Sequence, residues 1–369
     1  MQGVTDALCL FPFSLSVGVL SGFGIAGGAA AAVVSLVFGV LCRIHFVPTY
    51  LLLLPVFTIA YRYGAAVSGA AVLLGGVLAF FLSLLPQNAR DALRAPATWA
   101  GFLVAAAFST TVLQTTKYFD IGAVGGTVPE MLRDYVSLGF HPNWRGILYG
   151  TIVMVVLITY PRKFKRLSKK LPAAFVSLLI TLPLHLLLVP DAVHSPVKEL
   201  GAFSLLQGPD GAFLRGSFSV SMLPLLLCSA LSLALLMTAG LPKNTAQKLS
   251  AVSAVGGFLG AAPLGTDGTE RNRLSFLLSV PLTIALYFVP GLSRMPLPSP
   301  AVILIVTAWQ CVDWGQLRRA FRLRSLPFLL CAAVLPVLFG VHYTVPALWI
   351  LGMAENSSIL DTPSKRVII

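Results

Sequence analysis

The stretch Pro263-Leu-Gly-Thr-Asp-Gly-Thr-Glu-Arg-Asn272 is a polar, glycine-punctuated run between the apolar stretches 249–262 and 274–290. It gathers two carboxylates and one guanidinium in a chain that is 57% hydrophobic and only 11% charged. Such a run is either a water-exposed loop or the start of a helix held at membrane depth. The two alternatives predict different proteins, and the rest of the chain decides between them.

The composition around this run is that of a membrane protein. The mean hydropathy is +0.87, and apolar runs of about twenty residues, long enough to cross a ~30 Å hydrocarbon layer, recur from end to end. We therefore expect an all-α polytopic membrane protein. The five cysteines lie far apart, and we find no metal-ligand cluster, Ser/His/Asp arrangement or phosphate-binding loop. Neither an enzyme nor a bound cofactor or metal is expected.

The charge distribution gives an orientation. A net charge of +13 would suggest nucleic acid as a partner of a soluble protein, but here the bases lie in short loops between apolar spans. That pattern is the positive-inside rule, so nucleic acid is not expected. About fourteen segments are predicted, and the basic loops, of which 162–170 is the densest, all follow even-numbered segments. This count places the basic loops and both termini in the cytoplasm, with the chain in the plasma or inner membrane.

Two of the predicted segments, 48–60 and 267–274, are too short to cross a membrane alone. They are the third and the tenth, and this spacing predicts a seven-plus-seven inverted repeat with broken helices that meet at the membrane midplane. Two facing helix N-termini would form an anion site from their unpaired N–H groups and partial positive charges. Arg271 would add a full charge. Asp267 and Glu270 are expected to cap the tenth helix as a capping box, or to bind a coupling cation.

Several motifs resemble the SulP family of sulfate-permease-like anion transporters. The likeness covers the transmembrane part of that family, without its cytoplasmic STAS domain, and extends over nearly the whole chain. It is carried by Pro12 and Gly22 in the first segment, by Val47-Pro-Thr49, by Lys169-Lys-Leu-Pro-Ala-Ala-Phe175, by Gly256–Pro263 with an arginine within eight residues, and by Val306–Arg319.

The resemblance implies a core domain that moves against a gate domain in elevator-type alternating access. The core would hold 1–85 and 191–292, the gate 86–190 and 293–354, and 355–369 would be a cytoplasmic tail. The implied partners are a small inorganic anion of the sulfate, bicarbonate or chloride class and the lipid bilayer, while a homodimer stays an open option. The anion would lie between helices three and ten, at Phe13, Pro48, Thr49, Thr238, Thr269 and Arg271.

The chain also departs from that family. Helix eight carries no acid in 231–240, so sodium or proton coupling through it is not expected, although Asp267 and Glu270 keep a cation-coupled alternative open. Phe13 stands where the family usually has glutamine. Two other functions remain: a nucleobase permease of the xanthine–uracil type, with Glu270 bonding the base, and an uncoupled anion channel.

Overall fold

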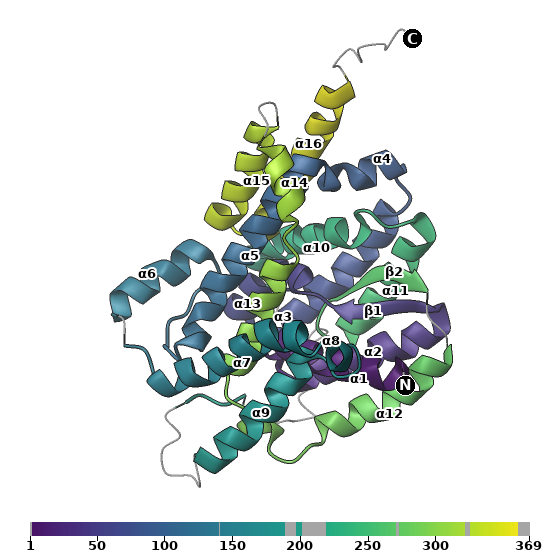
Figure 1. The fold of residues 1–369 in the computed structure, drawn as a ribbon. Helices are drawn as coiled ribbons and strands as arrows, with labels where there is room; N and C mark the ends of the chain where they lie inside the picture. The colour runs from purple at the N-terminus through teal and green to yellow at the C-terminus, as the bar shows by residue number, and fades with distance from the viewer. Residues whose placement is uncertain are drawn as a thin grey trace, which may run out of the picture.

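The structure is a computed structural model that describes residues 2–139, 141–188, 197–200, 219–270, 273–321 and 325–360. Most of these residues are helical, because the apolar runs satisfy their backbone groups internally. Figure 1 shows how the elements are arranged. In chain order they are α1 (Gln2–Leu20), α2 (Gly24–Cys42), β1 (Ile44–Pro48), α3 (Tyr50–Leu82), α4 (Gln87–Arg90), η1 (Asp91–Arg94), α5 (Pro96–Tyr118), α6 (Val128–Leu138), α7 (Trp144–Lys163), α8 (Lys165–Ser168), α9 (Ala173–Leu188), η2 (Val220–Met222), α10 (Leu223–Thr238), α11 (Lys243–Phe258), β2 (Leu264–Glu270), α12 (Arg273–Tyr287), η3 (Leu292–Arg294), α13 (Pro298–Gln310), α14 (Trp314–Ala320), α15 (Leu326–Phe339) and α16 (Val341–Leu360).

The helices confirm the membrane class predicted from hydropathy. Within the described residues, six helical stretches are long and apolar enough to cross a membrane: α1, α2, α3, α5, α7 and the stretch from η2 through α10. Shorter apolar helices, α9, α13, α15 and the second part of α12, accompany them. The chain is therefore an all-α polytopic membrane protein.

α3 contains the predicted third and fourth segments in one element of 33 residues. Gly64 interrupts it with φ 84° and ψ 177°, a backbone conformation that is not helical and that glycine adopts without the clash of a Cβ. α3 therefore consists of two helical pieces, one on each side of Gly64. The short third segment expected from the sequence is the first of these pieces.

The prediction of a short helix near 267–274 is wrong. Residues 264–270 form the strand β2, and α12 begins only at Arg273. β2 pairs antiparallel with β1, with Pro48 opposite Leu264 and Ile44 opposite Glu270. This pairing satisfies backbone groups that a helix would have satisfied within itself. Asp267 and Glu270 thus lie in a strand that ends before α12 begins, and their roles as capping or cation-binding residues stay predictions.

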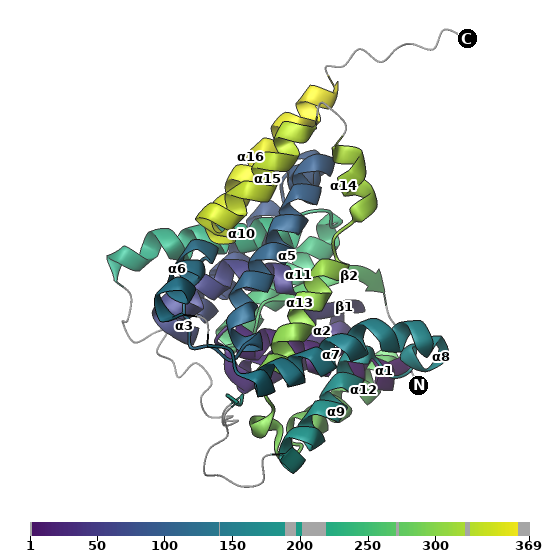
Figure 2. The same cartoon turned by 60° about the vertical axis from the view of Figure 1, so that its left-hand side comes forward.

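The helix that follows each strand packs on the helices that precede the other strand. α3, which follows β1, packs on α10 and α11, which precede β2. α12, which follows β2, packs on α1 and α2, which precede β1. This crossed pattern is the one expected of an inverted repeat. Outside this unit, α5 packs on α13 and α15, and α7 packs on α9 and α13; Figure 2 shows α5 and α13 crossing the middle of the molecule. The division into core and gate domains remains a prediction.

Several chain segments with basic residues lie at one face of the molecule. Lys248 Nζ at the start of α11 donates to Cys42 O at the end of α2, at 3.3 Å. The start of α1 lies at that end of α2, and Thr5 Oγ1 donates to Lys170 O at 3.4 Å. We call this the basic face. The other end of the bundle, where α6 lies, is called the distal face.

Candidate functional site

β1 leads the chain into the N-terminus of α3 at the centre of the molecule. Thr49 is the N-cap residue, with extended backbone angles of φ −136° and ψ 141°, and its side chain makes no capping hydrogen bond. The N–H groups of the first helical turn have no acceptor within the helix. Their partial positive charge and the Thr49 hydroxyl are therefore available to a ligand.

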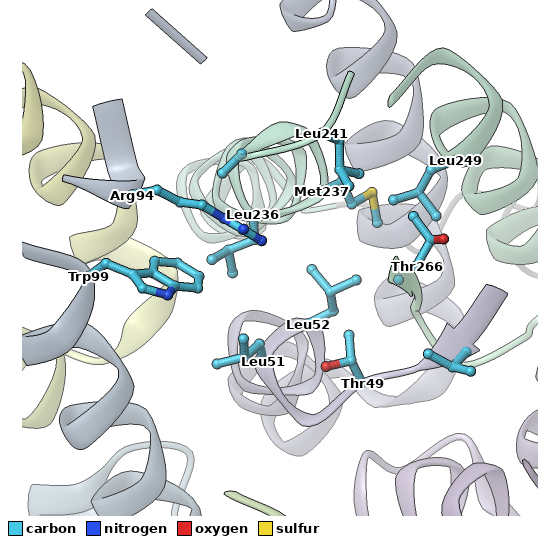
Figure 3. A pocket seen from close by; sticks show the side chains of 13 residues that line it. Thr49, Leu51, Leu52, Arg94, Trp99, Leu236, Met237, Leu241, Leu249 and Thr266 are labelled. Carbon is cyan, nitrogen blue, oxygen red and sulfur yellow. The ribbon is translucent and has the colours of Figure 1, made fainter. Parts of the chain in front are cut away.

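A cavity of about 200 Å³ lies against this N-terminus and is lined by residues of β1, α3, η1, α5, α10, α11 and β2. Most of its wall is apolar and includes Leu52 and Met237. Figure 3 shows Arg94 and Trp99 on one side of the cavity, with Thr49 and Thr266 on the other. The cavity thus combines one guanidinium and two hydroxyls with an apolar wall, an arrangement typical of sites for small polar ligands.

Arg94 provides the cationic group of this cavity. Its Cζ lies 5.1 Å from the centroid of the Trp99 ring, which is cation–π geometry. Loss of hydration lowers the pKa of Arg94 from its usual value, and Asp91 acts in the opposite direction. An arginine stays charged in proteins despite such shifts. The cavity therefore carries a fixed positive charge beside an aromatic ring.

Gly240 makes the space for this guanidinium. A Cβ at Gly240 would lie 2.4 Å from Arg94 Cζ, which no real contact allows. The residue also has φ +72°, in the left-handed region that glycine tolerates and other residues rarely adopt. The turn between α10 and α11 is thus shaped to accept the Arg94 side chain.

Hydrogen bonds hold the segment that carries Arg94 against this turn. Asp91 Oδ1 accepts from Gly240 N at 2.9 Å, and Arg90 Nη1 donates to Leu241 O at 2.8 Å. Trp349 Nε1 of α16 donates to Ala89 O at 2.6 Å. The position of Arg94 is therefore set by two neighbouring elements rather than by a free surface loop.

The start of α5, which carries Trp99, is fixed by a buried carboxylate of α16. Glu355 accepts hydrogen bonds from Ala97 N at 2.8 Å, from Thr98 N at 2.9 Å and from Thr98 Oγ1 at 2.8 Å. A carboxylate suits a helix N-terminus because the free N–H groups and the helix dipole stabilise negative charge there. Trp99 is held in place as a consequence.

On the opposite side of the cavity, β2 lies close to the start of α3. Thr266 Oγ1 donates to His45 O at 2.6 Å and accepts from Gly268 N at 3.0 Å. A Cβ at Gly265 would lie 2.9 Å from Thr49 Cγ2, so glycine permits the close approach. The Thr266 hydroxyl is occupied by these bonds, and Thr49 is left as the hydroxyl best placed for a ligand.

Three of the residues predicted for the site are described with their side chains near this region. Thr49 lines the cavity, and Pro48 precedes it, buried in β1. Thr238 is buried, but its hydroxyl donates to Ala234 O of its own helix at 2.9 Å. Its neighbours Met237 and Ala239 line the cavity in its place.

The other predicted residues are not brought to the cavity by the described contacts. Phe13 is partly buried and packs against both large hydrophobic clusters of the core. Asp267, Thr269 and Glu270 have a described backbone in β2, but their side chains lie outside the described part. Arg271 lies outside the described residues altogether. Its role stays a prediction.

Arg94 and Trp99 were not predicted as site residues, because the basic residues between the apolar spans were interpreted only as a signal of orientation. The signal available was the spacing Arg94-Ala-Pro-Ala-Thr-Trp99, in which a proline opens a helix between a cation and an aromatic residue. This spacing does not predict that the segment with Arg94 packs against the turn between α10 and α11.

At the distal face, α3 is tied to two other elements. Thr58 Oγ1 donates to Gly126 O at 2.7 Å and lies 3.3 Å from His342 Nδ1 of α16. Arg62 pairs with Glu130 of α6 at 2.5 Å. The cavity beside Thr58 and Gly126 measures only about 10 Å³. We call this group of contacts the distal closure, because it leaves no room for a ligand.

Glu130 is held in its charged form within this closure. Partial burial acts to raise the pKa of Glu130, but the hydrogen bond from Gly126 N and the ion pair with Arg62 outweigh it, and the pKa is lowered. The same carboxylate accepts from Gly126 N at 2.9 Å, so it links α3 to the segment before α6. The closure is therefore made of charged and hydrogen-bonded groups at the water-exposed end of the bundle.

No protein-family model and no curated protein sequence matches this chain, but solved structures do. The transmembrane domain of a cyanobacterium bicarbonate transporter, BicA, matches with a TM-score of 0.71 at 18% identity, over 95% of each chain. SLC26A9 matches with a TM-score of 0.76 at 12% identity, over 97% of this chain and 64% of that one. Murine Slc26a9, an anion transporter in the inward-facing state, matches with a TM-score of 0.73 at 13% identity, over 97% of this chain and 67% of that one. The likeness shows that this chain has the fold of these transmembrane domains.

Proposed function

We propose that this chain is a secondary transporter of small inorganic anions that works by alternating access. The observation that carries the proposal is the cavity of about 200 Å³ in which the N-terminus of α3 and the Thr49 hydroxyl lie opposite the Arg94 guanidinium. Fixed donors and a full positive charge within an apolar wall favour an anion, because the low polarity of the wall strengthens each electrostatic contact. Sulfate, bicarbonate and chloride are the proposed class.

The shape of the donor set favours a small anion over a nucleobase. A guanidinium donates two parallel hydrogen bonds to an oxyanion. A neutral base would need acceptors as well as donors along its edge, and the described side chains that line the cavity include no carboxylate. The nucleobase alternative is therefore the weaker one for this cavity.

Alternating access is supported by the unequal ends of the molecule. The cavity lies toward the basic face, beside η1 and the turn after α10, whereas the distal closure holds the other end of the first piece of α3. With the basic face in the cytoplasm of a plasma or inner membrane, this is an inward-facing state. Murine Slc26a9 in the inward-facing state is among the similar structures. An elevator-type motion of α3 and α10 against α5 would move the anion between the two faces.

Coupling to sodium through α10 is not part of the proposal. The helix reads LPLLLCSALSLALLMT and carries no acid. A cation taken from water into an apolar segment needs carboxylate or carbonyl oxygens as ligands. We therefore propose anion flux that continues without a sodium gradient.

A flux panel tests this function. The purified full chain is reconstituted in liposomes, and uptake of sulfate, bicarbonate, chloride and uracil is followed with and without sodium. Arg94→Gln removes the charge of the cavity, and we expect uptake to fall by about a hundredfold, as for loss of a charged group that contacts the ligand. Arg318→Gln, on the exposed surface of α14, is the matched control and should leave uptake unchanged.

Three results would overturn the proposal. Uptake of uracil without any anion flux would favour the nucleobase permease. A fast chloride current without saturation would favour the channel. Equal uptake by wild type and Arg94→Gln would remove Arg94 and its cavity from the anion path.

A further inference from the structure

Lys117 in the last turn of α5 is a partly buried cation close to α3. Its Nζ lies 5.2 Å from the centroid of the Phe57 ring of α3. Nζ also donates to the buried side chain of Gln114, at 3.0 Å from Oε1. The ammonium is thus held between an aromatic ring of one helix and an amide of the other.

No carboxylate neutralises this ammonium among the described residues. Glu130 pairs with Arg62 and Glu199 with His185. Asp120, three residues after Lys117, accepts instead from Asn143 Nδ2 at 3.0 Å and from Lys198 N at 3.2 Å. An ammonium that leaves water without a counter-ion costs free energy. A charge kept at such a position therefore suggests a function.

Lys117 and Phe57 repeat the arrangement of Arg94 and Trp99 at the opposite end of α5. Trp99 and Lys117 are separated by about 27 Å along the helix, at 1.5 Å per residue. Near each end of α5 a cation thus lies beside an aromatic ring: Arg94 of η1 beside Trp99, and Lys117 beside Phe57 of α3. At the start of α5 the pair borders an open cavity; at its end the neighbouring Thr58 is tied down in the distal closure.

We propose that Lys117 and Gln114 form a second anion contact, which the anion reaches from the distal face once the distal closure opens. The inference rests on the proposed function and names the same class of ligand, a small inorganic anion. The ammonium attracts the anion, and the Gln114 amide adds a hydrogen-bond donor when Nζ turns to the ligand. Arg94 and Lys117 then serve the two faces in turn.

The test measures the apparent KM separately from each face. Right-side-out and inside-out membrane vesicles that contain the full chain are used, with sulfate, bicarbonate and chloride as probes. Lys117→Gln should raise the distal KM about tenfold, as expected for loss of a hydrogen bond to a charged group. The KM from the basic face should stay within twofold of wild type, because the Arg94 cavity is unchanged.

Two further variants separate charge from packing. Lys117→Arg keeps the charge and should restore the distal KM. Gln114→Met leaves the lysine in place and should raise the distal KM about threefold, in line with loss of one neutral hydrogen bond; it also serves if Lys117→Gln does not fold. Lys163→Gln, at the exposed end of α7, is the control and should change neither KM.

The outcomes distinguish this inference from the proposed function. Wild-type flux with an unchanged distal KM in Lys117→Gln and Gln114→Met would overturn the inference alone. An equal change from both faces would also overturn it, because it would indicate a general structural effect. Wild-type vesicles without anion flux would overturn both.

Discussion

At the basic face, α3 and α5 border a cavity of about 200 Å³ that holds Arg94 and Trp99, whereas the cavity beside α3 at the distal face measures about 10 Å³. The apolar helices are the same at both ends, so hydrophobic packing does not account for the difference. Polar contacts do: Thr58, Arg62 and Glu130 bond across the distal end, while Arg94 is held beside Trp99 at the basic end. Few groups therefore decide which end is open.

After Arg94→Gln itself, the largest change is expected from filling the space beside Arg94. Gly240→Ala would place a Cβ 2.4 Å from Arg94 Cζ, so the guanidinium must leave its place over Trp99. We expect anion uptake in liposomes to fall at least about tenfold, since a contact to a charged group is lost. Gly24→Ala is the matched control: its φ is also +72°, but nothing lies within 4 Å of the added Cβ. Equal losses in both variants would assign the effect to backbone strain.

A moderate change is expected from weakening the distal closure. Glu130→Gln removes the ion pair with Arg62, whose two side chains are 42% and 37% exposed. Because exposed pairs contribute only about 0.2–1 kcal/mol, we expect a two- to fivefold increase in the labelling rate from the distal face of Ser109→Cys, which lines the same small cavity. An unchanged rate would show that Arg62 and Glu130 do not hold the closure.

Lowering the pH should open the distal closure only once the pH falls below the usual pKa of a carboxyl group. The pKa of Glu130 is lowered in the folded protein, so its contribution is present above the usual carboxyl pKa and is lost as the pH falls through the lowered value. The labelling rate of Ser109→Cys, divided by that of a free thiol at the same pH to correct for the thiolate fraction, should therefore stay constant between about pH 7.5 and 5.5. A rise within that range would point to a group other than Glu130.

The smallest change is expected at Thr238. Its hydroxyl donates to Ala234 O within α10, so Thr238→Val should alter the KM for anion uptake by less than about twofold, because a bond within one helix contributes little net free energy. The family resemblance placed Thr238 at the anion. A tenfold rise in KM would favour that assignment over the present orientation of the hydroxyl.

The elements that depend on local sequence were predictable, whereas those set by distant partners were not. Apolar runs predicted the membrane helices, and Gly64 lies four residues after the predicted end of the short third segment, 48–60. β2 was mistaken for a helix because its polar, glycine-punctuated sequence suits a helix start as well as a strand. The choice is made by β1: Thr266 bonds to His45, 221 residues away. Arg94 was missed for a similar reason, since Asp91 and Gly240 bring it to the cavity.

The most direct test of the central claim is protection of a cysteine at the start of α3. In a background whose five natural cysteines are replaced by serine, Thr49→Cys is labelled with a membrane-impermeant maleimide from the basic face. We predict ready labelling without anion and a rate at least about tenfold lower with saturating sulfate, bicarbonate or chloride, because a bound anion would cover this position. Equal labelling with and without every one of these anions would contradict an anion site at the N-terminus of α3.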